Sequence, residues 1–224
     1  MAAHMDAMDM SAMALHPWTA SDFAMMLLMW AVMMVGMMVP SATPMALVYA
    51  SVARKARRQG TPVAPTFLFV GGYIIMWCLF SVGATAAQWA LERAALLSPH
   101  MVATSPALGA VLLGAAGVYQ LTPAKDACLR HCRAPAHFLA EHWRPGLAGA
   151  LRMGLEPGAW CLGCCWILMA LLFVGGVMNL LWVAAIALFV LLEKALPLGD
   201  RGGRVAGWAM LAAGAVAFLT WLRD

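Results

Sequence analysis

Charged side chains are scarce in this sequence. Of its 224 residues, 14 are Lys or Arg and 10 are Asp or Glu, so 11% of the chain is charged whereas 64% is hydrophobic. Soluble globular domains carry about 25% charged residues. The scarcity of charge therefore excludes a soluble globular enzyme, a disordered chain and a nucleic-acid-binding protein. At about 20 apolar residues per crossing, the chain has room for roughly five to seven membrane-spanning helices.

Six apolar segments are long enough to be considered as membrane spans. They are residues 21–47, 65–91, 105–123, 157–174, 180–197 and 205–222. The fourth and fifth are separated only by 175–179 and could form one kinked element, and Glu156-Pro157-Gly158 indicates a break before the fourth. We therefore expect an all-α, polytopic membrane helix bundle, in which residues 21–224 form a single transmembrane domain with a hydrophilic Cys-containing loop at 123–156.

The Lys and Arg residues predict the orientation of this bundle. With six spans and the N-terminus outside, twelve of the 14 basic residues fall on the cytoplasmic side, and only Arg93 and Arg223 fall outside. Basic residues accumulate on the cytoplasmic side of membrane proteins. We therefore expect both termini outside, residues 1–20 as an external tail that is retained because it lacks a signal-peptide pattern, the loop at 123–156 in the cytoplasm, and a location in the bacterial inner membrane.

Five of the six cysteines form two groups. Cys128 and Cys132 lie four residues apart, with His131 beside them, and this spacing places both thiols on one face of a helix. The second group is Cys161, Cys164 and Cys165. Thiolates favour Cu(I), Zn(II) and iron–sulfur clusters, so a metal site is one interpretation. Apolar packing and thiol redox exchange are the alternatives.

Methionine is abundant, with 19 residues. Met25, Met29, Met33 and Met37 recur every four residues of the first span, beside a second stripe of Met26, Met34 and Met38. Thioethers are soft, neutral ligands, so the first stripe is a candidate path for Cu(I), although apolar packing explains it equally simply. The N-terminal tail offers further soft ligands at His4, Met5, Met8, Met10, Met13 and His16.

Several motifs in combination resemble one bacterial family. They lie at residues 29–40, 121–133, 161–166 and 176–182 and at the pair Glu193-Lys194. The chain resembles the predicted metal-binding integral membrane proteins of bacteria, a domain of unknown function numbered 2182. The resemblance implies a metal-linked membrane role and carries over Lys125, Cys128, Cys132, Cys161, Cys164, Cys165, Asn179, Glu193 and Lys194 as candidate residues. From its position alone, Glu156 is a candidate to support the cysteine group.

The function expected from these patterns is copper handling in a membrane. The expected ligands are His and Met outside, Met within the span and Cys inside. This series would suit a Cu(I) carrier, or a factor that holds copper for assembly of a partner enzyme. Zinc and iron are alternative metals. Two other functions stay open. One is a non-catalytic subunit of a larger membrane complex with a structural metal, and the other is thiol–disulfide exchange at Cys161 and Cys164. The expected partners are the lipid bilayer and a membrane protein or second copy, not nucleic acid.

Overall fold

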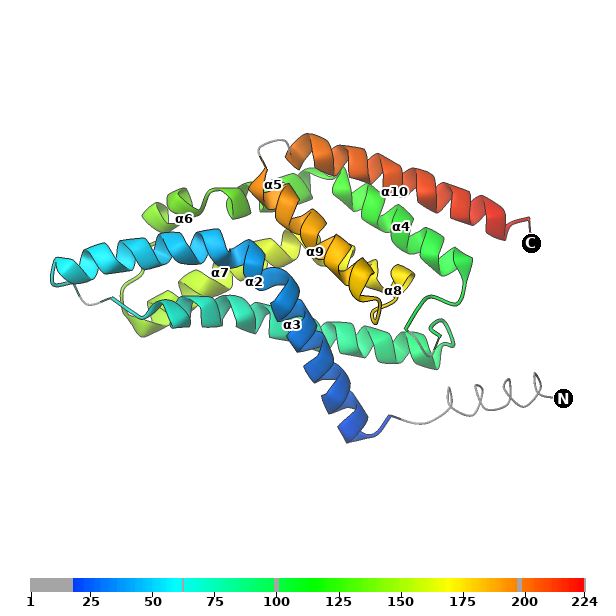
Figure 1. Cartoon of the computed structure of the whole chain (residues 1–224), viewed down its shortest axis with the longest axis horizontal. Helices are drawn as coiled ribbons and strands as arrows, with labels where there is room; N and C mark the ends of the chain where they lie inside the picture. The colour runs from blue at the N-terminus through cyan, green and yellow to red at the C-terminus, as the bar shows by residue number, and fades with distance from the viewer. Residues whose placement is uncertain (1–17, 62, 99–100, 197–198, 224) are drawn as a thin grey trace.

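The computed structural model describes residues 18–61, 63–98, 101–196 and 199–223. Within these residues the fold is all-α and contains no β-strand, as the sequence predicts. The helices are α2 (Ala20–Arg58), α3 (Thr66–Arg93), α4 (Pro106–Gln120), α5 (Pro123–Arg133), α6 (Pro135–Glu141), α7 (Gly146–Ala170), α8 (Leu172–Gly175), α9 (Leu180–Ala195) and α10 (Gly199–Trp221) (Figure 1).

Helix α2 is longer than the expected first span. It begins with a capping box in which the Thr19 hydroxyl accepts from the backbone N–H of Asp22 and the Asp22 carboxylate accepts from that of Thr19. It then continues through Pro40 and Pro44 to Arg58. Proline removes a helical hydrogen bond and bends a helix, and Figure 1 shows that α2 changes direction partway along its length.

The expected break at residues 156–158 is wrong. Pro157 is buried inside α7, which begins at Gly146. Within the segment expected to be a hydrophilic loop, α5 and α6 precede this early start of α7, so most of residues 123–156 are helical. Residues 176–179 do interrupt the helix after α8, where Gly176 adopts a positive φ of 91°.

Two close backbone contacts hold the central helices together. A Cβ atom on Gly154 of α7 would collide with the Phe69 carbonyl of α3, and one on Gly72 of α3 would collide with the Leu151 carbonyl of α7. Helices α4 and α10 approach in the same way at Gly117 and Gly207. Small residues let helix backbones approach closely, as is common in membrane proteins.

The helix ends form two groups at opposite ends of the bundle. At one end, Trp18 Nε1 donates to the Glu92 carboxylate at 2.9 Å, and the Ala103 N–H donates to the Phe173 carbonyl at 2.8 Å. At the other end, Asp126 of α5 lies 3.9 Å from Arg204 of α10. Figure 1 shows α2 antiparallel to α3, and α4 antiparallel to α10. The expected position of both termini outside and the orientation in a membrane stay predictions.

Several helices are suited to a membrane. Four described helical segments are long and apolar enough to cross one, namely Ala20–Arg58, Thr66–Arg93, Gly146–Gly175 and Arg201–Trp221. A fifth crossing is possible if α4 and α5, which meet at a 65° bend, form one broken span. Helix α9 has 16 residues, or about 24 Å at ~1.5 Å per residue, against a hydrocarbon core of about 30 Å. The count of six spans therefore stays a prediction.

Candidate metal centre

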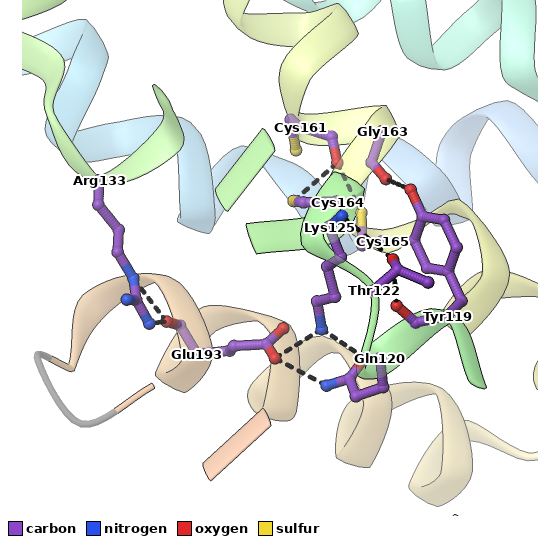
Figure 2. Close-up of polar contacts among 10 residues, drawn as sticks. All are labelled: Tyr119, Gln120, Thr122, Lys125, Arg133, Cys161, Gly163, Cys164, Cys165 and Glu193. Carbon is purple, nitrogen blue, oxygen red and sulfur yellow. Dashed lines mark hydrogen bonds and ion pairs between the residues drawn. The ribbon is translucent and has the colours of Figure 1, made fainter. Parts of the chain in front are cut away.

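Helix α5 packs on α7 and carries the first cysteine group onto the second. The Thr122 hydroxyl caps the start of α5 by accepting from the Lys125 N–H at 3.3 Å, immediately after the bend that follows α4. On α7, Gly163 leaves room for the Cys128 side chain, because a Cβ atom there would lie 2.8 Å from the Cys128 sulfur. The Tyr119 hydroxyl, near the end of α4, donates to the Gly163 carbonyl and so joins α4 to the same part of α7 (Figure 2).

The two cysteine groups form one thiol cluster, which consists of Cys128, Cys132, Cys161, Cys164 and Cys165. Across the α5–α7 contact, Cys132 and Cys161 line the same small cavity. Within α7, the Cys164 and Cys165 thiols both donate to the Cys161 carbonyl, and the Cys128 side chain packs against Gly163, the residue before Cys164. All five are free cysteines. The structure therefore brings together thiols that the sequence could only place at the same end of the molecule.

The Cys161 sulfur has polar contacts with side chains from two other helices. Lys194 Nζ, from α9, donates to the Cys161 sulfur at 2.7 Å and to the Ser41 hydroxyl at 3.3 Å. The Tyr73 hydroxyl, from α3, lies 2.9 Å from the same sulfur and 3.2 Å from the Met38 carbonyl oxygen. Side chains from α3 and α9 thus contact the Cys161 sulfur of α7 directly, and α2 contacts both of these side chains.

A small cavity lies beside Cys161. Its volume is about 30 Å³, and its lining includes Cys132, Cys161, Tyr73, Lys194 and Met45. One water molecule needs about 10–15 Å³ of such space, so a single ion fits. Thiols from two different helices line this cavity, with one ammonium group and one thioether residue in the same wall.

The orientation of the thiols decides which metals the site suits. Within the described residues, no group of three or more His, Cys, Asp or Glu side chains is arranged to hold a metal ion. Cys164 and Cys165 instead direct their thiols to the Cys161 carbonyl oxygen, both at 3.0 Å (Figure 2). Structural zinc takes four ligands in a tetrahedron, whereas soft Cu(I) accepts thiolate ligands in smaller numbers. A Cys132–Cys161 pair supplies two of the four ligands that a structural zinc site takes.

A buried ion pair braces the helix that carries Cys128 and Cys132. Lys125 Nζ lies 2.6 Å from Glu193 Oε1, and the two side chains are only 1% and 3% exposed. Gln120 Nε2 donates to the same carboxylate oxygen at 2.7 Å, and Arg133 Nε donates to the Glu193 backbone carbonyl at 3.1 Å (Figure 2). These contacts join α4, α5 and α9, so Lys125 and Glu193 position the cluster without belonging to it.

Other candidate residues lie outside the thiol cluster. His131 is exposed; its ring stacks on Trp160 at 4.1 Å between centroids, and its Nδ1 lies 2.9 Å from the Ala127 carbonyl oxygen. Glu156 pairs with Arg144 at 3.3 Å and with Arg152 at 3.7 Å. Asn179 caps α9 by accepting from the Trp182 N–H at 3.2 Å, at the far end from Lys194. The part of the chain that the structure describes gives these residues structural contacts rather than contacts with the thiols.

The two methionine stripes of α2 differ in burial. Met25 is 59% exposed and Met29 and Met33 are partly buried, whereas Met34 and Met38 are fully buried. The buried stripe therefore follows Trp30, Met34 and Met38, with the half-buried Met26 one turn before it, and of the candidate path only Met37 is buried. Gln88 supports the outer part, since its Oε1 accepts from Trp30 Nε1 at 2.7 Å and its Nε2 lies 3.7 Å from the Met26 sulfur. The tail candidates His4, Met5, Met8, Met10, Met13 and His16 lie outside the described residues.

Sequence reasoning overlooked several polar residues inside apolar helices. Tyr73, Ser41, Gln120 and Gln88 all contact the cluster, its bracing ion pair or the methionine stripe. Polar residues within membrane-spanning segments are rare and often functional, so their presence there was a usable signal. Sequence alone could not say which of them meet.

The comparisons with known proteins support a copper-related role. No curated protein and no solved structure matches the chain. A family model described as PpoB2, copper chaperone, matches residues 27–217. This description fits the metal-related role implied by the motifs, although it is not the family numbered 2182 that they resemble. The matched residues contain the buried methionine stripe, all five clustered thiols and Lys194, and over this length the chain belongs to the PpoB2 copper chaperone family.

Proposed function

We propose that this protein is a membrane-embedded copper chaperone that holds Cu(I) between Cys132 and Cys161 and releases it to a partner protein. The observation that carries the proposal is the cavity of about 30 Å³ lined by these two cysteines from two different helices. Membership of the copper chaperone family supports copper as the metal. The thiol ligands support Cu(I) as its oxidation state, because soft thiolates favour Cu(I).

The half-buried thiols of α5 suit the release step. Copper leaves such a site by ligand exchange, in which an entering thiolate forms a Cu–S bond as a bond to Cys132 or Cys161 breaks. Because Cys128 and Cys132 of α5 are half-buried whereas the cysteines of α7 are buried, α5 is the side of the cluster from which a partner would take the ion.

The proposed location is the bacterial inner membrane. The four long apolar helices support insertion into a bilayer, and the distribution of Lys and Arg supports a cytoplasmic position for the thiol cluster. A chaperone at this position would meet its partner in the membrane or at the cytoplasmic surface.

A Cu(I) carrier is the second candidate function. The buried thioethers of Met34 and Met38 favour it, since Tyr73 contacts both the Met38 carbonyl and the Cys161 sulfur and so connects the stripe to the cluster. A carrier requires copper uptake by sealed vesicles that contain the protein, and this uptake should fall when Met34 and Met38 are both replaced by Leu. A chaperone requires binding and transfer without uptake.

Copper titration of purified protein tests the binding proposal. Protein in detergent is titrated anaerobically with Cu(I) against a chromophoric Cu(I) chelator. We expect about one equivalent to bind tightly to wild type, and Cys132→Ser and Cys161→Ser to weaken it by at least about tenfold, since each removes one of two soft ligands. Cys78→Ser is the matched control, because Cys78 is an exposed cysteine on α3 outside the cluster. An equal loss in all three variants would contradict the proposed site.

A further inference from the structure

We infer that Lys194 makes the thiol site selective for a monovalent soft cation over a divalent one, because its ammonium group supplies a fixed positive charge beside the bound ion. This inference rests on the proposed function and names its specificity-determining residue. It concerns which class of metal ion the cavity accepts.

The environment of Lys194 is unusual for a lysine. Its ammonium group contacts the Cys161 sulfur and the Ser41 hydroxyl in a part-buried position. Among the described residues, the ionisable side chains that act on this ammonium group are the thiols of the cluster and the Tyr73 hydroxyl, and none of them is a carboxylate. The adjacent Glu193 turns its carboxylate to Lys125 instead. A desolvated ammonium requires a compensating anion, and the thiol cluster is the anion source at hand.

The charge balance of the cavity then distinguishes the two classes of ion. Two thiolates from Cys132 and Cys161 together with the Lys194 ammonium leave one negative charge for the metal to neutralise. A monovalent ion such as Cu(I) brings the site to zero, whereas a divalent ion such as Zn(II) leaves an uncompensated positive charge. An uncompensated charge away from water is unfavourable. The charges of Lys125 and Glu193 cancel each other, so this pair does not change the net charge of the cavity.

The remaining thiols do not readily restore balance for a divalent ion. Cys164 and Cys165 each direct their thiol to the Cys161 carbonyl at 3.0 Å, so recruiting either one breaks an existing hydrogen bond. An exposed cation would not impose the same preference, because water and salt screen exposed charges. The position of Lys194 against Cys161 therefore carries the selectivity.

The test compares two redox-inert ions, Ag(I) and Cd(II), in place of Cu(I) and Zn(II). The affinity of each is measured by competition on purified full-length protein for wild type, Lys194→Met, Lys194→Gln and Lys194→Arg. Arg130→Met is the matched control, since Arg130 is an exposed cation on the same helix as Cys132. We expect the ratio of Ag(I) to Cd(II) affinity to fall by at least about tenfold in the two neutral variants, and to change by less than about threefold in Lys194→Arg and Arg130→Met.

A second measurement needs no variant. The same affinity ratio is determined for wild type and for dithiothreitol, a dithiol without an ammonium group, and we expect the protein ratio to be higher by at least about tenfold. Equal ratios in wild type and dithiothreitol, or an unchanged ratio in a folded neutral variant that still binds Ag(I), would overturn the role of Lys194 alone. Absence of cysteine-dependent Ag(I) and Cu(I) binding in wild type would instead overturn the proposed function, and the selectivity with it.

Discussion

Glu193 allows the sharpest test of how the thiol cluster is held in place. Its carboxylate accepts from Lys125 at 2.6 Å and from Gln120 at 2.7 Å, and both members of the ion pair are almost fully buried. Glu193→Gln keeps the size of the side chain but leaves the Lys125 ammonium without its counter-charge. Removing one partner of a buried ion pair costs about 3–5 kcal/mol. At about 2–4 °C per kcal/mol, the midpoint of thermal unfolding should fall by roughly 6–20 °C.

The assay follows unfolding of the detergent-purified protein with a thiol-reactive fluorescent dye. Cys161, Cys164 and Cys165 are at most 2% exposed, so the dye reports their release when α5 and α7 separate. The control is the double variant Lys125→Met/Glu193→Leu, which removes both charges together. Replacing a whole buried pair by apolar residues is often neutral, so we expect most of the lost stability to return.

Two results would refute this reasoning. The first is a Glu193→Gln protein whose unfolding midpoint lies within about 2 °C of wild type, which would correspond to less than about 1 kcal/mol. The second is a double variant no more stable than Glu193→Gln, which would show that the carboxylate acts through something other than the charge of Lys125.

Two further variants test the packing of the helices. Gly154→Ala should prevent recovery of folded protein, because the added methyl group meets the Phe69 carbonyl. Gly36→Ala is the control and should behave as wild type, because nothing lies within 4 Å of its added carbon. Size-exclusion chromatography distinguishes the two variants, and a monodisperse Gly154→Ala protein would contradict the close contact. Trp30→Phe removes a 2.7 Å hydrogen bond and leaves the buried Gln88 oxygen unpaired, so it should cost about 1–3 kcal/mol in the thermal assay, and restored stability in Trp30→Phe/Gln88→Leu is the expected control.

The helices could be predicted from sequence more readily than their ends. Apolar composition over some 20 residues indicates a membrane helix whatever lies around it, and each expected span corresponds to at least part of a helix in the described chain. The sequence did not predict that the first helix extends to Arg58 or that Pro157 lies inside a helix. Proline normally ends a helix, but the buried position of Pro157 within α7 lets the helix continue.

The site could be predicted only in its parts. The spacing of Cys128 and Cys132 shows that they share a helix face, and the family resemblance singles out Glu193 and Lys194. Neither kind of information shows that adjacent residues on α9 serve different neighbours, with Glu193 bonded to Lys125 and Lys194 bonded to Cys161. Successive residues of a helix point about 100° apart, so each can meet a different helix once the bundle has formed.

The amino-acid sequence by itself determined the helical class, the apolar segments and the soft ligands available, because each depends on composition or on spacing within one segment. Only the tertiary structure decided that α5 folds back onto α7, that Tyr73 and Lys194 meet at Cys161, and that Met34 and Met38 are buried while Met25 is exposed. These contacts join residues as far apart in the chain as Ser41 and Lys194. They depend on close helix contacts at glycines, on helix bends and on a buried ion pair. A local pattern of residues cannot predict how these features combine in space.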